Sequence, residues 1–261
     1  MSKHKNKGRK QDEYPAQPTS EESPKPFRLN KFVAHSGICS RRQAAEYIKQ
    51  GLVTVNDEVV LEPYYQVQDE DRVKFKGKPI KVEEKKVYIL LNKPKDTITT
   101  MKDEHGRRTV WDLLRNKVKE RIFPVGRLDR ATTGLLLLTN DGDLAERLAH
   151  PRHEVKKVYH VVLDKDVTSK HLEQIRVGLE LEDGLAPVDG VNYIDNAGKN
   201  EIGIEIHIGR NRIVRRIFEH LGYKVKRLDR VYYGGLTKKD LPRGFHRHLT
   251  KQEIIMLKHF S

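Results

Sequence analysis

The stretch from Val125 to Gly142 constrains the fold of this chain more than any other. It reads VGRLDRATTGLLLLTNDG, so a single carboxylate, Asp129, stands between two arginines and precedes the apolar run Leu135–Leu138. The apolar runs on either side of Asp129 are each short enough to be a buried strand. An aspartate in a loop usually forms a turn or caps a helix. Here two cations and a core strand surround it, and this combination predicts an ionised carboxylate at the floor of a basic cleft.

The net charge of the chain favours a polyanionic partner. Fifty-one Lys and Arg residues against 37 Asp and Glu residues give a net charge of +14 and an isoelectric point near 9.7. Such an excess favours nucleic acids, through phosphate neutralisation and counterion release. The alternative is a basic solubilising tail. Residues 1–26 carry six basic and four acidic side chains, a net +2, which leaves +12 of the +14 on the rest of the chain.

The cysteine content and the apolar runs bear on the cellular compartment. A single cysteine, Cys39, excludes an internal disulfide framework and favours a reducing compartment. Met1–Lys7 lacks the apolar core of a secretory signal, and no apolar run approaches the roughly 20 residues needed to cross a bilayer. We therefore expect a cytoplasmic protein with no membrane partner.

Composition along the chain divides it into four segments. Residues 1–26 are rich in Lys, Gln, Ser, Pro and Glu and poor in apolar residues, so we expect a disordered tail. Residues 27–76 are expected to form a small domain, residues 77–86 a charged linker, and residues 87–261 a second, larger domain.

The first of these domains is expected to contain two short helices followed by strands. Ser40 is a good N-cap for a helix over residues 41–48, which Gly51 ends. Valines around Asn56 and Asp57 predict a hairpin. Four cations gather in this unit as candidate RNA contacts, and the alternative for the arginine pair is an ordinary solvated helix face. They are Arg28, Lys31, Arg41 and Arg42.

The second domain alternates strands and helices. Strands are expected over residues 87–91, 122–128, 135–138, 157–163, 191–194 and 201–208. Helices are expected over residues 142–149, 169–178, 214–221 and 251–260, and a short helix over 109–114. Many strands with a few interspersed helices predict an α+β fold, in which helices flank a mixed, mostly antiparallel sheet.

Common cofactor and metal motifs are missing from the sequence. No Gly-rich phosphate loop ends in Gly-Lys-Ser/Thr, and no Gly-x-Gly-x-x-Gly follows a strand. One cysteine rules out cysteine-based zinc spacing. His246 and His248 form a His-x-His pair, but the proline, glycine and arginines around them predict a basic surface loop. We expect chemistry without a metal ion or a cofactor.

Two further elements could contribute to a site. Tyr159 lies in a predicted strand beside Lys157. Packing is the default for a strand tyrosine, but flanking cations favour base stacking, which is typically worth ~1–3 kcal/mol. The other element is an amphipathic helix whose start is rich in arginine: Arg210, Arg212, Arg215 and Arg216. Basic residues there fit the helix dipole poorly, which favours an external anion or an internal carboxylate as their partner.

Together these motifs resemble those of the pseudouridine synthases that modify bacterial ribosomal RNA. The matching elements are Asn92-Lys93-Pro94, Gly126 to Asp129, Lys157 to Tyr159 and Gly209 to Arg216. Residues 28–76 in turn resemble the alpha-L-type RNA-binding module, so the resemblance covers the chain after its tail. Asp96, Ala131 and Ile213 depart from the residues usual in the family, and they bear on target choice more than on chemistry.

The resemblance implies a role for each matching residue. Asp129 would be the catalytic carboxylate, and Arg215 would pair with it, although the spacing also allows Arg212. Tyr159 would stack on the target base, and Arg127 would fill the gap left by the flipped nucleotide. The remaining cations of these motifs are candidate RNA contacts: Arg130, Lys157, Arg210, Arg212 and Arg216.

The implied reaction is the isomerisation of uridine to pseudouridine, which breaks the C1′–N1 bond and remakes it at C5. A carboxylate near C1′ can act as a nucleophile or assist proton removal from the sugar, and the sequence leaves both routes open. The favoured substrate is ribosomal RNA, and large-subunit RNA is favoured over small-subunit RNA. The RNA is expected to be either free or in a partly assembled subunit. The protein is expected to be a monomer. The alternatives are a non-catalytic ribosome assembly factor of the same fold and a synthase for transfer RNA.

Overall fold

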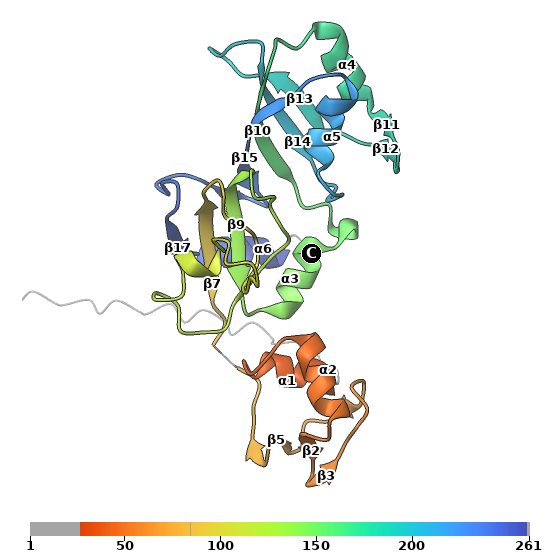
Figure 1. Cartoon of the computed structure of the whole chain (residues 1–261), viewed down its shortest axis with the longest axis vertical. Coiled ribbons are helices and arrows are strands. Elements are labelled where there is room, and N and C mark those ends of the chain that lie inside the picture. Colours follow the sequence, from red (N-terminus) through yellow and green to blue (C-terminus); the bar gives the residue numbers. More distant parts are fainter. Residues whose placement is uncertain (1–26, 84, 260–261) are drawn as a thin grey trace, which may run out of the picture. The chain divides into compact units, whose positions relative to one another are not determined.

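The computed structural model describes residues 27–83 and 85–259. The chain divides into two compact units, Met1–Lys81 and Val82–Ser261, whose elements are labelled in Figure 1, and each is described by itself. The tail expected over residues 1–26 lies outside the described residues. In the described part of the chain, no helix is both long and apolar enough to span a bilayer.

One apolar core holds the helices and strands of the first unit together. It combines residues of the two helices, such as Leu29 and Ile48, with valines of the strands. The helices are α1 (Leu29–His35) and α2 (Arg41–Lys49). A four-stranded antiparallel sheet has the order β3-β2-β5-β6, and β1 pairs with β4. These strands are β1 (Phe27–Arg28), β2 (Val53–Val55), β3 (Glu58–Val59), β4 (Gln66–Val67), β5 (Val73–Phe75) and β6 (Lys78–Pro79).

Local sequence signals in this unit act as expected. The Gln43 amide donates to Ser40 Oγ at 3.2 Å, which confirms Ser40 as the N-cap of α2. Asn56 and Asp57 have φ values of 52° and 72°, the left-handed conformation that a two-residue hairpin turn requires. The β2–β3 hairpin is therefore confirmed. The segment expected as a linker over residues 77–86 begins with strand β6, which pairs with β5.

The second unit is an α+β fold built on one large, mostly antiparallel sheet, as the sequence predicts (Figure 1). The strand order is β13-β14-β10-β15-β9-β7-β17, with β8 paired to β9 and β16 to β15. The strands are β7 (Tyr88–Lys93), β8 (Phe123–Pro124), β9 (Thr133–Thr139), β10 (Lys157–Leu163), β13 (Gly190–Tyr193), β14 (Glu201–Ile206), β15 (Val225–Tyr233), β16 (Leu236–Thr237) and β17 (His246–His248). A separate hairpin joins β11 (Leu179–Leu181) to β12 (Gly184–Ala186).

Helices cover both faces of the sheet, which explains the unbroken leucine run in β9. The helices are α3 (Gly142–Ala149), α4 (Ser169–Val177), α5 (Ile213–His220) and α6 (Lys251–His259). Successive strand residues point to opposite faces, so Leu135 and Leu137 join the core that contains residues of α3 and α6. Leu136 and Leu138 join the core that contains residues of α4 and α5. A strand buried on both faces needs apolar residues throughout.

The sheet is joined in the middle by a short parallel contact. Strands β15 and β9 run parallel and pair over two positions, Asp229 with Thr133 and Arg230 with Gly134, whereas the other strand pairs in the described residues are antiparallel. Gly134 has a φ of +106°. A Cβ atom at this position would lie 2.3 Å from the carbonyl oxygen of Arg230 and 2.5 Å from its amide nitrogen. Glycine is therefore required where the two halves of the sheet meet.

Charged side chains reinforce this junction. Arg230, which is 3% exposed, donates from Nε to the carbonyl oxygen of Leu135 at 2.7 Å. Asp229 accepts hydrogen bonds from Thr133 Oγ1 at 2.9 Å, from Arg243 at 2.8 and 3.0 Å, and from Lys238. Burial opposes the charge on Asp229, but its bonds to Arg243 and Lys238 outweigh burial and lower the pKa of Asp229 to about 2.

Several expectations about elements of this unit were wrong. Strand β15 was not expected, because the charged residues of Val225–Tyr233 hide its alternation of buried and exposed positions. His246 and His248 lie on strand β17, which pairs with β7, instead of in a surface loop. The strand expected over residues 122–128 is only Phe123–Pro124, and the rest is loop. The short helix expected over residues 109–114 is a 3₁₀ turn over Trp111–Leu113.

Replacing Gly134 with alanine tests the close approach of β15 to β9. We expect Gly134→Ala to lower the free energy of unfolding by about 2–4 kcal/mol, because the new methyl group overlaps backbone atoms and the residue keeps a strained positive φ. Gly106→Ala is the matched control, since Gly106 has a φ of +65° but open space within 4 Å of the position that a Cβ would take. We expect that control to cost about 1 kcal/mol. Equal losses for the two variants in urea unfolding would contradict the close contact.

The ion-pair network at the junction predicts a pH-dependent contribution to stability. The pKa of Asp229 is about 2 in the folded state and close to 3.9 in an unfolded chain. Its stabilising effect is therefore complete above pH ~4 and is lost as the pH falls towards 2. We expect Asp229→Asn to lower the free energy of unfolding by about 2–3 kcal/mol at pH 7, with a deficit that shrinks between about pH 4 and 2.5. Urea unfolding at several pH values measures this, and a deficit unchanged by pH would refute it.

Candidate active site

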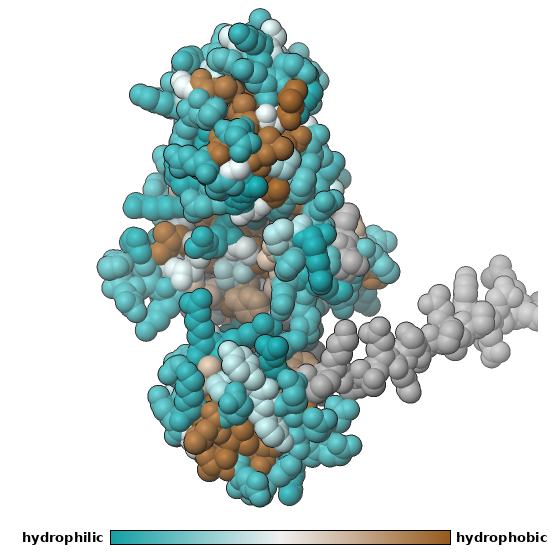
Figure 2. Space-filling model, turned by 90° about the vertical axis from the view of Figure 1, so that its right-hand side faces the viewer, coloured by the Kyte–Doolittle hydropathy of each residue, from teal (hydrophilic) through white to brown (hydrophobic). Residues whose placement is uncertain are grey.

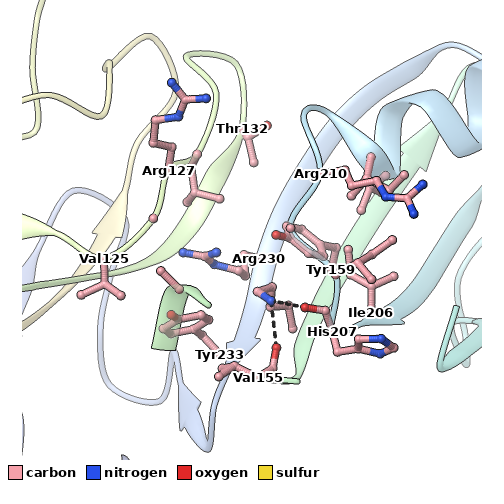
Figure 3. Close-up of a pocket in the computed structure, with 18 of the residues that line it drawn as sticks. Val125, Arg127, Thr132, Val155, Tyr159, Ile206, His207, Arg210, Arg230 and Tyr233 are labelled. Atoms are coloured by element: carbon pink, nitrogen blue, oxygen red, sulfur yellow. Dashed lines mark hydrogen bonds between the residues drawn. The ribbon is translucent and has the colours of Figure 1, made fainter. Parts of the chain in front are cut away.

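A pocket of about 470 Å³ lies beside the junction of the two half-sheets. Figure 3 shows its walls, with Arg127 and Thr132 on one side, Tyr159 and Arg210 on the other, and Arg230 between them. The first wall belongs to the loop between β8 and β9, and the second to β10 and to the turn before α5. The parallel contact of β15 with β9 thus brings two distant parts of the chain to one cavity.

Asp129 lies in the loop that leads into β9, and its side chain is 40% exposed. Its carbonyl oxygen accepts a hydrogen bond from the Thr132 amide at 3.0 Å, which closes a turn around the residue. The next carbonyl, that of Arg130, accepts from the Asp96 amide at 2.9 Å. These bonds fix the backbone while the carboxylate lines the pocket.

Lys93 supports this loop from within the protein. It is fully buried, and its ammonium group donates to the carbonyl oxygens of Thr97 at 2.7 Å, Pro94 at 3.0 Å and Arg130 at 3.4 Å. Burial lowers the pKa of Lys93 to about 8, although the charges of Asp129 and Asp96 oppose this shift. The lysine of the Asn-Lys-Pro element is therefore a buried cation tied to the backbone beside Asp129.

Arg215 is the arginine that the structure brings to Asp129. It lies in the first turns of α5, is 7% exposed, and places Nε 4.0 Å from Asp129 Oδ2. Its Nη1 donates to the carbonyl oxygen of Val225 at 3.2 Å, while Nε has no hydrogen-bond partner among the described residues. Burial and the charge of Arg212 lower the pKa of Arg215, and Asp129 raises it. Arg212 instead forms an ion pair with Glu219 at 3.3 Å.

Tyr159 lines the wall opposite Arg127 (Figure 3). It is 8% exposed and lies on β10, where it pairs with Arg230 of β15. Lys157, two residues earlier, turns its ammonium group to the carbonyl oxygens of Val155 and His207. Burial, helped by the charge of Arg230, lowers the pKa of Lys157 to about 8. Lys157 is thus anchored to backbone oxygens in the pocket wall.

Three other arginines near the pocket lie close to carboxylates. Arg216 binds Asp183 through both terminal nitrogens, at 2.8 and 2.9 Å, and Arg210 lies 3.6 Å from the same carboxylate. Arg130 lies 3.3 Å from Asp96, and both of these side chains are exposed. Arg127 also lines the pocket.

The candidate RNA contacts of the first unit lie at its surface. The Arg28 guanidinium stands over the Tyr64 ring at 5.4 Å, and the Lys31 ammonium over the Phe27 ring at 4.9 Å. Arg41 and Arg42 are exposed at the start of α2. Figure 2 shows that hydrophilic side chains cover most of the visible face of the molecule, interrupted by apolar patches.

Sequence reasoning did not single out Arg230, Lys93 or Asp183 as parts of the site. Arg230 could have been found only by recognising strand β15, in which Leu228 and Arg230 are buried on either side of Asp229. The strand itself was not predicted. Lys93 lies in a recognised motif, but its burial depends on contacts with distant loops. Within the described residues, no group of three or more His, Cys, Asp or Glu side chains could hold a metal ion.

The fold and the pocket define an RNA-modifying isomerase in which a carboxylate faces a buried arginine. A family model described as RNA pseudouridylate synthase matches residues 87–220, and a model of the S4 domain matches residues 27–73. The chain belongs to the RNA pseudouridylate synthase family and is an RNA pseudouridine synthase with an N-terminal S4 domain. The family resemblance stated from the sequence is confirmed.

Curated relatives and a solved structure match most of the chain. An uncharacterized RNA pseudouridine synthase of Aquifex aeolicus is 42% identical over 233 residues, which cover 88% of this chain and 93% of the relative. Ribosomal large subunit pseudouridine synthase B of Bacillus subtilis is 42% identical over 236 residues, covering 88% and 95%. A crystal structure of a pseudouridylate synthase superposes with a TM-score of 0.64 at 31% identity and covers 88% of this chain and 99% of that one.

The geometry distinguishes the two arginines that could pair with Asp129. If Asp129 is the catalytic carboxylate, as proposed below, we expect Arg215→Met to slow pseudouridine formation on the order of a hundredfold, because it removes a fixed cation beside Asp129. Arg212→Met is expected to slow it less than tenfold, since Arg212 pairs with Glu219. Single-turnover rates at saturating enzyme compare the two. A larger loss with Arg212→Met would show that the wrong arginine has been assigned to Asp129.

Proposed function

We propose that this protein isomerises a uridine of large-subunit ribosomal RNA and that Asp129 is its catalytic carboxylate. The observation that carries the proposal is the placement of Asp129: a half-exposed carboxylate that lines a 470 Å³ pocket, 4.0 Å from the buried Arg215. The name of the Bacillus subtilis relative supports the large subunit as the target. The charge of +12 outside the tail supports an RNA partner.

The isomerisation needs a carboxylate at the sugar, which Asp129 supplies. The C1′–N1 bond of uridine breaks, the base turns and C5 bonds to C1′; C5 then gives up its proton and N1 takes one up, so the atoms of substrate and product are the same. Asp129 acts at the sugar as a nucleophile on C1′ or as a base that removes a sugar proton. Both routes need an ionised carboxylate, and Arg215 places its Nε 4.0 Å from Asp129 Oδ2.

The pocket walls are suited to hold the nucleotide out of its helix. Unstacking a base costs a few kcal/mol, which stacking on Tyr159 offsets by ~1–3 kcal/mol. Arg127, on the opposite wall (Figure 3), is proposed to occupy the gap that the flipped base leaves. Arg28, Lys31, Arg41 and Arg42 of the S4 domain are proposed to bind RNA phosphates and to add affinity without chemistry.

The main rival from another class is an assembly factor that binds ribosomal RNA without modifying it. Basic charge and an S4 domain suit both functions equally. Asp129 and Tyr159 line one pocket, and the buried Arg215 stands 4.0 Å from Asp129. This set favours catalysis, because a binding protein has no need of it. We further propose that the substrate is ribosomal RNA, free or in a partly assembled subunit, and that the protein acts as a monomer. A transfer RNA substrate is a weaker alternative.

The test of this function replaces Asp129 with asparagine, which keeps the size of the side chain and removes its charge. Pseudouridines are mapped in ribosomal RNA from cells that lack the protein and from the same cells complemented with wild type or Asp129→Asn. We expect one or more large-subunit positions to depend on the wild-type protein and to stay unmodified with the variant.

The purified Asp129→Asn variant should bind RNA at least as well as wild type, because the substitution removes an anion from a basic pocket. Its melting midpoint should lie within a few degrees of that of wild type. A complete map with Asp129→Asn would sink the catalytic assignment, and an unchanged map in cells lacking the protein would sink the ribosomal one.

A further inference from the structure

Asp183, in the turn of the β11–β12 hairpin, binds two arginines that flank the turn over residues 211–212. Its carboxylate binds Nη1 and Nη2 of Arg216 at 2.8 and 2.9 Å. Its carbonyl oxygen and that of Gly184 accept hydrogen bonds from Arg210 Nη1 at 3.1 and 3.0 Å. One residue thus joins two guanidinium groups, one on each side of the turn over residues 211–212.

This turn determines where the functional arginines lie. Arg212 has a φ of +47° and is the N-cap of α5, but its side chain makes no capping hydrogen bond. The turn is held instead by Arg216, whose Nε donates to the carbonyl oxygen of Asn211 at 2.9 Å. Arg216 follows Arg215 directly in α5, so the pair with Asp183 fixes the helical turn that presents Arg215 to Asp129.

The electrostatics agree with a specific pairing. Hydrogen bonding to Arg216, together with the charges of Arg216 and Arg210, holds the pKa of Asp183 below its ordinary value. Arg210 lines the pocket, at a place where an RNA phosphate could also reach it. The Asp183 carboxylate occupies Arg216 and lies 3.6 Å from Arg210 Nη1. It competes with such a phosphate by its charge at Arg210 and, at Arg216, because arginine binds carboxylate and phosphate oxygens in the same bidentate geometry.

We infer that Asp183 is a positioning residue of this synthase: it holds the turn so that Arg215 stays against Asp129, and it restrains Arg210 and Arg216 from binding RNA phosphates. The inference rests on the proposed roles of Asp129 and Arg215. Asp183 does not touch the reacting atoms, and it acts on the chemistry through Arg216.

This role predicts that loss of the carboxylate changes rate and affinity in opposite directions. In Asp183→Asn the turn loses its ionic anchor, so Arg215 is held less firmly, and misplacement of a group beside the reacting atoms slows the chemical step on the order of tenfold. Arg210 and Arg216 lose their counter-charge at the same time. RNA is therefore expected to bind about threefold more tightly, with a salt dependence steeper by about one phosphate contact.

The experiment uses the full chain and an unmodified fragment of large-subunit ribosomal RNA that contains the target uridine. Single-turnover rate, RNA affinity across a range of about 50 to 300 mM salt, and melting midpoint are measured for wild type, Asp183→Asn and Asp183→Glu. We expect Asp183→Glu to restore most of the rate, because the longer carboxylate still reaches Arg216. The matched control is Glu253→Gln, since Glu253 also binds one arginine, Arg247, through two bonds at 2.7 and 2.8 Å, but on α6 outside the pocket lining. Glu253→Gln removes a negative charge, as Asp183→Asn does, and should change the single-turnover rate and the RNA affinity less than twofold.

Several outcomes would overturn the inference. They are an unchanged rate in Asp183→Asn, the same change in Glu253→Gln, and a joint fall of rate, affinity and melting midpoint, which would mark Asp183 as merely structural. Tighter binding without slower turnover would also overturn it, because it would leave Asp183 as an electrostatic screen only. Failure of the proposed function is seen separately, as a wild-type protein that does not modify the RNA or an Asp129→Asn variant that does.

Discussion

The parallel contact between β15 and β9 is the constraint on which the rest of the second unit depends. It spans two residue pairs, and the bond from Arg230 to the Leu135 carbonyl joins residues 95 positions apart. Asp129 stands four residues before this contact on β9, and α5 with Arg215 comes just before β15. The approach allowed by Gly134 therefore sets the distance between the carboxylate and its arginine. The active-site geometry follows from the way in which two antiparallel half-sheets are joined.

The cations around the pocket fall into two groups according to what holds them. Lys93, Lys157 and Arg215 donate hydrogen bonds to backbone carbonyl oxygens, which carry no net charge; Arg215 also faces Asp129 at 4.0 Å. Arg210, Arg216 and Arg130 lie close to carboxylates. Fixed charges of the first group stabilise an anion without reorganisation, which is the larger part of electrostatic catalysis. In the second group, carboxylates compete with RNA phosphates for the same guanidinium groups.

Local signals explain what could be predicted from the sequence. Helix α3 has the expected bounds because Asp141 caps it, accepting a hydrogen bond from the Leu144 amide, and β10 because its residues alternate. The missed features depend on distant contacts. Strand β15 reads as a basic stretch, and only its pairing with β10 and β9 buries Leu228, Arg230 and Tyr233. The direction of the Lys157 side chain could not be predicted either, because it is set by the carbonyl of His207, 50 residues away. The Asp129–Arg215 pair was predictable only through the family resemblance, since spacing also allowed Arg212.

In the proposed function this synthase must bind a polyanion strongly and still keep Arg215 beside Asp129. Free arginines beside Asp129 would serve the first need, but RNA phosphates would then draw them away from the carboxylate. Burial of Arg215 resolves this conflict, because a side chain 7% exposed and bonded to the Val225 carbonyl is shielded from phosphates. The exposed arginines of the S4 domain and the rim of the pocket can then bind RNA without disturbing the Asp129–Arg215 pair. Separating the buried cations from the exposed ones is thus what allows one basic protein to combine RNA affinity with carboxylate chemistry.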